Sequence, residues 1–388
     1  MEEWKSYKAI DFCETVTDGT HDSPKPQESG HYLITSKHLQ NNAIDFSTAY
    51  RISETDYQKI IQRSKVVQYD ILFSMIGTIG NTVRVTQPHV DFAVKNMAIF
   101  KMGEDNLKSK WLYYWLKSDP AKEYILSRLA GSTQSYLTLD SLRNFPVKVP
   151  DKNLMQRIVD VLSSIDNKIE LNNRINHNLE EQIQEQFDTM LLNDQGLGYC
   201  HVSDIIEVNP LRKLSKSSIA RCIEMSSLST SGPFPSNWEY REYNGGMKFI
   251  NGDTIMARIT PCLENGKVSF VNYLDENEVG FGSTEYIVMH SKKDVPVELT
   301  YFLARNKDFV DYAVKNMNGS SGRQRVSGDT IAQYELPIIS KESIDYFANI
   351  ARSAMNCICK NCFENRTLAQ TRDILLPKLM NNGINAVI

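Results

Sequence analysis

The residues best suited to chemistry lie in a loop of small side chains near position 320. Residues 319–325 have the sequence Gly-Ser-Ser-Gly-Arg-Gln-Arg. Glycines let backbone amides approach a phosphate closely, while Arg can form two hydrogen bonds to guanine and Gln two to adenine. We therefore expect this segment to contact DNA; the alternative is a solvated loop that caps a helix. The candidate contacts are Ser320, Ser321, Arg323, Gln324 and Arg325.

A second loop of the same kind lies earlier in the chain. Residues 131–135 have the sequence Gly-Ser-Thr-Gln-Ser and lack the two arginines. Such a difference is expected of two sites that share one scaffold but contact different bases. The candidate contacts here are Ser132, Thr133 and Gln134.

Further candidates follow two apolar segments that each begin at an Asp. Loops at the exits of buried strands commonly carry function, so we expect DNA contacts there as well. Thr20 and His21 lie in another loop, rich in Pro and Gly, where they either contact DNA or shape a turn. The candidates in the first two loops are Ser74, Gly77, Thr78, Arg258 and Thr260.

No segment has the pattern of a catalytic centre. The nearest match to the Asn-Pro-Pro-Tyr type of methyltransferase loop is Asn209-Pro210-Leu211-Arg212, which is typical of a turn. Gly266 and Lys267 lack the upstream glycine of a phosphate-binding loop, because Pro261 stands at that position. The seven histidines show no spacing diagnostic of a metal site or an activated nucleophile. We therefore predict a non-catalytic chain without a metal or a cofactor.

The cysteines do not change this prediction. Their number, seven, is odd, and they are scattered along the chain, which favours reduced thiols. Cys357, Cys359 and Cys362 would lie on different faces of a helix, so packing or exposure is favoured over zinc binding.

Composition limits the class of protein. A chain of 388 residues should form two or three domains, and no apolar run approaches the roughly 18 to 20 residues that span a bilayer. The acidic N-terminus lacks the apolar stretch of a secretory signal, so we expect a cytoplasmic protein with no membrane partner. The net charge of −4 argues weakly against nucleic acid as the partner, although the distribution of charge matters more than its sum.

The chain contains an internal repeat with a period of nearly half its length. Five weakly similar blocks occur in the same order in both halves, at a nearly constant offset, which indicates a duplication. Each copy should place an Asp at the turn before a buried strand and end in an apolar strand followed by a helix. The matched blocks are 11–14 with 204–207, 69–76 with 252–259, 96–100 with 285–289, 112–116 with 299–303, and 131–146 with 319–337.

Each copy is followed by a segment with helical periodicity. Apolar residues recur every three or four positions from Leu154 to Leu191, and again from Ile344 to Leu379. A helix of about 40 residues would be about 60 Å long and needs an equally long partner, so the two should pack antiparallel as a rigid spacer. Asn172, Asn361 and Asn365 fall on the two apolar stripes, where they either lie buried and fix the register or face solvent.

These patterns predict an α+β protein in which two repeated mixed α/β domains are separated by two long antiparallel coiled-coil helices. The expected segments are a first domain at 1–150, a central helix at 151–192, a second domain at 193–339 and a C-terminal helix at 340–388.

Two segments carry a resemblance to a known family. Residues 154–172 (LMQRIVDVLSSIDNKIELN) and 368–379 (LAQTRDILLPKL), within this architecture, resemble the specificity subunits of Type I restriction-modification systems. The resemblance covers the whole chain. It implies two target-recognition domains that each bind half of a split target in double-stranded DNA, and helices that hold the half-sites apart. It also implies docking of methylation subunits, two in number, and of restriction subunits that act in defence against foreign DNA.

Two alternatives remain at this point. A protein-binding coiled-coil scaffold would show no change in DNA preference when Arg323, Gln324 and Arg325 are substituted. A nuclease or methyltransferase with an unrecognised centre would turn over substrate when divalent metal or S-adenosylmethionine is supplied.

Overall fold

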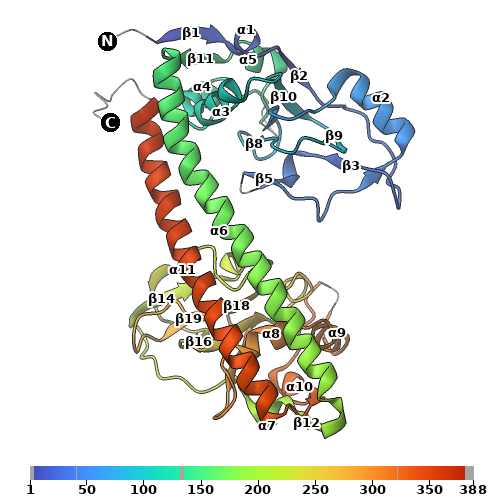
Figure 1. The fold of residues 1–388 in the computed structure, drawn as a ribbon, viewed down its shortest axis with the longest axis vertical. Coiled ribbons are helices and arrows are strands. Elements are labelled where there is room, and N and C mark those ends of the chain that lie inside the picture. Colours follow the sequence, from blue (N-terminus) through green and yellow to red (C-terminus); the bar gives the residue numbers. More distant parts are fainter. Residues whose placement is uncertain (1–3, 41, 132–134, 321, 381–388) are drawn as a thin grey trace. The chain divides into compact units, whose positions relative to one another are not determined.

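The computed structural model describes residues 4–40, 42–131, 135–320 and 322–380 (Figure 1). The chain divides into two compact units. Unit 1 comprises residues 1–167 and 368–388, and unit 2 comprises residues 168–367.

Both units are built on the same four-stranded antiparallel sheet. The strand order is β2-β10-β7-β8 in unit 1 and β13-β20-β17-β18 in unit 2, which are equivalent orders. This identity confirms the duplication predicted from the five matched blocks. The strands are β2 (Thr15–Asp18), β10 (Met97–Lys101), β7 (Ile71–Ser74) and β8 (Thr82–Arg84), and β13 (Ile206–Val208), β20 (Tyr286–Ser291), β17 (Asp253–Ala257) and β18 (Val268–Phe270).

A second sheet in each unit contains a parallel pair of strands. In unit 1, β3 (His31–Ile34) lies between β6 (Arg51–Ile52) and the parallel β9 (Phe92–Val94). The connection from β3 to β9 includes helix α2 (Glu54–Ser64) and a small hairpin, β4 (Leu39–Gln40) and β5 (Ala43–Ile44). Unit 2 has the order β15-β14-β19-β16, with β14 (Ile219–Ile223) parallel to β19 (Gly280–Gly282). Its other strands are β15 (Glu239–Glu242) and β16 (Met247–Phe249). The copies therefore differ most in this sheet.

The remaining elements repeat from one unit to the other. Helices α3 (Asn106–Trp115), α4 (Asp119–Ser127) and α5 (Leu139–Arg143) correspond in order to α8 (Leu299–Arg305), α9 (Lys307–Lys315) and α10 (Gly328–Ala332). A two-stranded sheet follows in each unit, β1 (Lys5–Lys8) with β11 (Pro146–Val149) and β12 (Tyr199–His201) with β21 (Glu335–Pro337). Short helical turns are α1 (Ala9–Phe12), α7 (Val202–Ile205) and three 3-10 segments, Ser36–His38, Gln195–Leu197 and Met225–Ser227.

The Asp residue before a buried strand is a structural group in both copies. The Asp70 carboxylate accepts a hydrogen bond from the Val67 N–H at 2.8 Å, and Asp253 accepts one from the Ile250 N–H at the same distance. Both side chains are fully buried. Asp70 forms an ion pair with Lys101 and Asp253 one with Arg212, and Asp253 Oδ1 also lies 2.7 Å from His290 Nδ1. The repeated Asp therefore closes a turn, as the sequence predicts.

The two predicted long helices are α6 (Lys152–Asn193) and α11 (Lys341–Met380), which run side by side in Figure 1. Asn172 Nδ2 donates to Asn365 Oδ1 at 2.9 Å, and Asn361 Nδ2 donates to Asn176 Oδ1 at 2.8 Å. Residue numbers rise along one helix as they fall along the other, so the helices are antiparallel. Asn172 is fully buried and also donates to Glu364, whereas Asn361 and Asn365 are half-buried.

Each long helix contributes to the core of both units. In unit 2 the Phe187 ring packs against Phe347 at 5.6 Å between centroids, and Phe302 of α8 lies 5.7 Å from Phe347. In unit 1, Leu162 of α6 and Leu379 of α11 join the core beneath α3. Helix α6 begins and ends one residue from the expected limits of 151 and 192, and α11 begins one residue after 340. The expected end of the second helix at 388 lies outside the described residues, and the four-part division of the chain stays a prediction. Within the described ranges, no helix is long and apolar enough to cross a membrane.

Candidate nucleic-acid interface

Strand register brings the candidate loops of unit 1 to one end of the sheet. Asp18, the last residue of β2, pairs with Ala98, and Ser74, the last residue of β7, pairs with Met97. The chain therefore leaves β2 and β7, and enters β10, at the same end of the sheet. We call this end, with the loops 19–22 and 75–80, Asn96 and Tyr136, the loop end of unit 1.

Unit 2 repeats this arrangement. Ala257, the last residue of β17, pairs with Tyr286, the first residue of β20. The loop that follows β17 meets the segment before α10: the Val326 N–H donates to the Arg258 carbonyl at 3.0 Å and the Thr260 N–H to the Gln324 carbonyl at 3.1 Å. The loop end of unit 2 (residues 258–264, Glu285, 318–320 and 322–325) thus brings together two candidate segments that are far apart in sequence.

Glu285, which sequence reasoning missed, fixes the side chain of the candidate residue Arg325. The Arg325 Nε donates to both Glu285 oxygens at 2.9 and 3.0 Å, and Nη2 donates to Oε1 at 2.8 Å. The hydrogen bonds from Arg325 lower the pKa of the Glu285 carboxyl. Arg325 stays 38% exposed, so a rigidly held guanidinium edge reaches the surface. The internal repeat could have pointed to Glu285, because this residue is the first of a matched block at the start of a strand.

The matched residue in unit 1, Asn96, holds a different side chain. Asn96 Oδ1 lies 2.8 Å from His21 Nδ1, and His21 Nε2 lies 2.9 Å from Asp18 Oδ2. Thr20 is nearly buried, and its hydroxyl accepts a hydrogen bond from the Asp22 N–H at 3.1 Å. Thr20 therefore shapes the turn, while the exposed His21 is the side chain presented to solvent.

In and before the loop that follows β7, one candidate residue is buried and two are exposed. Ser74 is fully buried, its hydroxyl donates to the Thr78 carbonyl, and it accepts from the Asn81 N–H at 2.8 Å. Gly77 has a φ of 78°, in the left-handed region that favours glycine, and Gly77 and Thr78 are exposed. Ser74 thus organises the loop that presents the other two.

Tyr136 is a second residue that sequence reasoning missed. It forms an isolated bridge with Ile76, as Arg325 does with Ile259, and its side chain is 41% exposed. The same place on the scaffold therefore carries a tyrosine in unit 1 and an arginine in unit 2. The predicted contacts Ser132, Thr133, Gln134 and Ser321 lie outside the described residues.

The other candidates of unit 2 lie at its loop end. Ser320 and Arg323 are exposed, and the Ser320 carbonyl accepts from the Arg323 N–H at 3.0 Å. Gln324 is half-buried, and the Thr260 hydroxyl donates to Glu264 at 2.9 Å. Arg258 Nε is buried 4.0 Å from Glu285, with no hydrogen-bond partner in the described part of the chain.

The long helices are attached to each unit by an equivalent tyrosine. The Tyr114 hydroxyl donates to Asp166 of α6 at 2.7 Å, and the Tyr301 hydroxyl donates to Glu180 of the same helix. Burial raises the pKa of both phenols, so they remain protonated donors. The sequence blocks 112–116 and 299–303 had aligned these two residues.

Metal-ligand geometry is not found in the described ranges, where no cluster of three or more His, Cys, Asp or Glu side chains could hold an ion. Cys359 and Cys362 pack on α11, and burial raises the pKa of their thiols to about 11 and about 12. Cys357 on the same helix is exposed.

Comparison with known proteins identifies relatives across the whole chain. Residues 1–181 match the family model described as "Type I restriction modification DNA specificity domain". The HindI specificity subunit of Haemophilus influenzae is 22% identical over an alignment that covers 99% of this chain and 100% of the relative. The EcoAI specificity subunit of Escherichia coli is 30% identical over 138 residues, which cover 34% of this chain and 23% of the relative.

A solved structure has the same fold. The S subunit of a Type I restriction-modification system from M. genitalium superposes with a TM-score of 0.56 and 15% identity, covering 97% of this chain and 96% of that one. The predicted architecture of two mixed α/β domains with long helices is thereby confirmed. Residues 1–181 match the family model, and the chain as a whole is similar to specificity subunits of Type I restriction-modification systems in sequence and in fold.

Proposed function

We propose that this chain recognises a bipartite target in double-stranded DNA and directs methylation and restriction subunits to it. One observation carries the proposal. Equivalent loop ends on two copies of one sheet present different side chains: Arg325, held by Glu285, in unit 2, and both Tyr136 and His21 in unit 1, where His21 is held by Asn96. One scaffold with two sets of exposed groups suits two different half-sites.

In this proposal the chain itself performs no catalysis, and two methylation subunits together with restriction subunits supply it. The loop ends supply the base contacts, and the long helices set the spacing between half-sites. The net charge of −4 offers little phosphate neutralisation, so the isolated chain should bind DNA weakly and the assembled complex tightly. Tight, specific binding by the isolated chain at physiological salt would contradict this point.

Arg325 and Glu285 provide a test of base recognition in unit 2. Arg325→Lys keeps the charge but loses the two-donor fork, so discrimination at one base pair of one half-site should fall by about 1–3 kcal/mol. Glu285→Gln should loosen the same base preference, because the guanidinium loses its bidentate partner. The measurement is methylation of a library of randomised half-sites by the assembled complex. Arg352→Lys, on the exposed face of α11, is the matched control, and it should leave the preference unchanged.

The decisive experiment is to express the chain with its methylation subunit in a host without DNA methylation and to map modified adenines by single-molecule sequencing. A split motif with a constant gap would support the proposal. Replacement of residues 19–22 and 75–80 in unit 1 should then change only one half of that motif. An assembled complex that modifies no defined sequence would contradict it and favour a protein-binding coiled-coil scaffold.

A further inference from the structure

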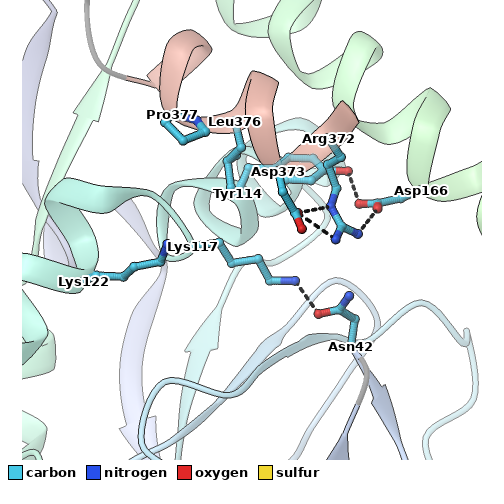
Figure 2. A pocket seen from close by; sticks show the side chains of 9 residues that line it. All are labelled: Asn42, Tyr114, Lys117, Lys122, Asp166, Arg372, Asp373, Leu376 and Pro377. Atoms are coloured by element: carbon cyan, nitrogen blue, oxygen red, sulfur yellow. Dashed lines mark hydrogen bonds and ion pairs between the residues drawn. The ribbon is translucent and has the colours of Figure 1, made fainter. Parts of the chain in front are cut away.

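A cavity in unit 1 is lined by basic side chains that no part of the proposed function uses. Its volume is about 360 Å³, within the lower range of small-ligand sites. Figure 2 shows side chains from α3 and its C-terminal turn, α4, α6, α11 and the β4–β5 hairpin converging on it. The lining residues are Asn42, Tyr114, Lys117, Lys122, Asp166, Arg372, Asp373, Leu376 and Pro377.

The charges that line the cavity are unevenly compensated. Arg372 is neutralised on both sides, by Asp166 at 2.8 Å and by Asp373 at 2.9 Å. Lys122, which is 63% exposed, has Asp119 at 3.2 Å. Lys117 has no carboxylate within ion-pair distance in the described part of unit 1. Lys117 is therefore the one basic side chain in the cavity lining for which no ion pair is recorded in the described part of unit 1.

Lys117 has neutral partners only. Its Nζ donates to Asn42 Oδ1 at 2.6 Å and to the Tyr113 hydroxyl, and it lies 3.8 Å from the centre of the Tyr113 ring. An ammonium group has three N–H donors, so one donor is left beyond these two acceptors. Burial lowers the pKa of Lys117 to about 7, against the opposing charge of Asp166. An anion that reached this group would stabilise its charged form and supply the missing acceptor.

We propose that this cavity binds a phosphate oxyanion, held by Lys117 with Lys122 at the rim. A phosphate has the acceptor oxygens that lysine donors bind in other proteins. Two sources share this chemistry, a DNA backbone phosphate and a free phosphate-bearing small molecule. The β4–β5 hairpin favours the first source, because Asn42 reaches Lys117 while the Leu39 carbonyl accepts from Asn81 Nδ2 at 2.8 Å, beside the loop that follows β7.

The test uses the full chain assembled with its methylation subunits and has two arms. In the first, the melting temperature Tm is measured in inorganic phosphate and in chloride at equal ionic strength. The wild type should melt about 2 °C or more higher at a phosphate concentration tenfold above Kd. Lys117→Met and Lys122→Met should lose all or part of this shift, while the exposed Lys148→Met on β11 should keep it. Lys122→Met removes a rim side chain and therefore guards against misfolding of the Lys117 variant.

The second arm, which rests on the proposed function, measures the salt dependence of binding to target and unrelated duplex DNA. If the source is the DNA backbone, Lys117→Met should reduce the slope of log K against log salt by about 0.9 on both duplexes. A phosphate shift in Tm without this slope change assigns the site to a small phosphate compound. If both lysine variants keep the full shift in Tm and the full slope, the proposed site is overturned. A wild-type complex without sequence preference that still gains Tm in phosphate would contradict the proposed function and leave this site standing.

Discussion

Removing seven residues from each long helix is expected to shorten the gap of the target by about three base pairs. Seven residues of helix are about 10 Å long, and B-DNA rises about 3.4 Å per base pair. The residues to remove are the facing segments 169–175 and 362–368, which are centred on the hydrogen-bonded pair Asn172 and Asn365. Seven residues are nearly two helical turns, so the faces that pack in each unit keep their orientation to within about 20°.

The measurement is the methylation motif of the shortened complex in a host without other DNA methylation. Both half-sites should be retained, and methylation of the original motif should be lost because its gap no longer fits. Insertion of seven residues into each helix at the same places is the paired control, and it should lengthen the gap by about three base pairs. A shortened complex that still modifies the original motif would show that something other than the helices sets the spacing.

Phe187→Ala should destabilise unit 2 by about 3–5 kcal/mol, the usual cost of removing a fully buried phenylalanine. The Phe187 side chain is 0% exposed and packs on Phe347, which in turn contacts Phe302 of α8. The substitution therefore leaves a cavity where α6, α11 and the globular part of unit 2 meet. For a unit of this size the change corresponds to a fall of about 10 °C in Tm.

Differential scanning calorimetry of the purified chain measures this effect. Leu192→Ala is the matched control, because Leu192 lies on the same helix and is 65% exposed, so its substitution should change stability by no more than about 0.5 kcal/mol. Equal melting temperatures for the two variants would show that the helices do not share a core with unit 2.

The features predicted best from the sequence are those encoded locally. Periodic apolar residues set the limits of α6 and α11 to within a few residues, since a stripe of apolar side chains at helical spacing depends only on the chain itself. The turn closed by Asp70 and Asp253 was likewise visible as a repeated residue before an apolar run. Asn172 shows where local information is insufficient: its type and place on the stripe left burial and exposure equally open, and contacts with Glu364 and Asn365 decide for burial.

The candidate interface divides in the same way. Sequence pattern placed Arg325 and His21 in exposed loops, but it also selected Ser74, whose side chain is fully buried and serves only the loop. Composition of a loop does not reveal which hydroxyl turns inward, because that depends on neighbouring backbone groups such as the Asn81 N–H.

By itself, then, the sequence determined that this protein consists of two copies of one α/β scaffold joined to two long helices, since repeats and periodicity are properties of the chain order. Only the tertiary structure decided which side chains act together. Glu285 meets Arg325 across 40 residues, and Asn42 meets Lys117 across 75, through strand register and helix packing that no local pattern contains. Contacts between residues distant in sequence are set by how buried surfaces fit together, and that fit exists only in the folded chain.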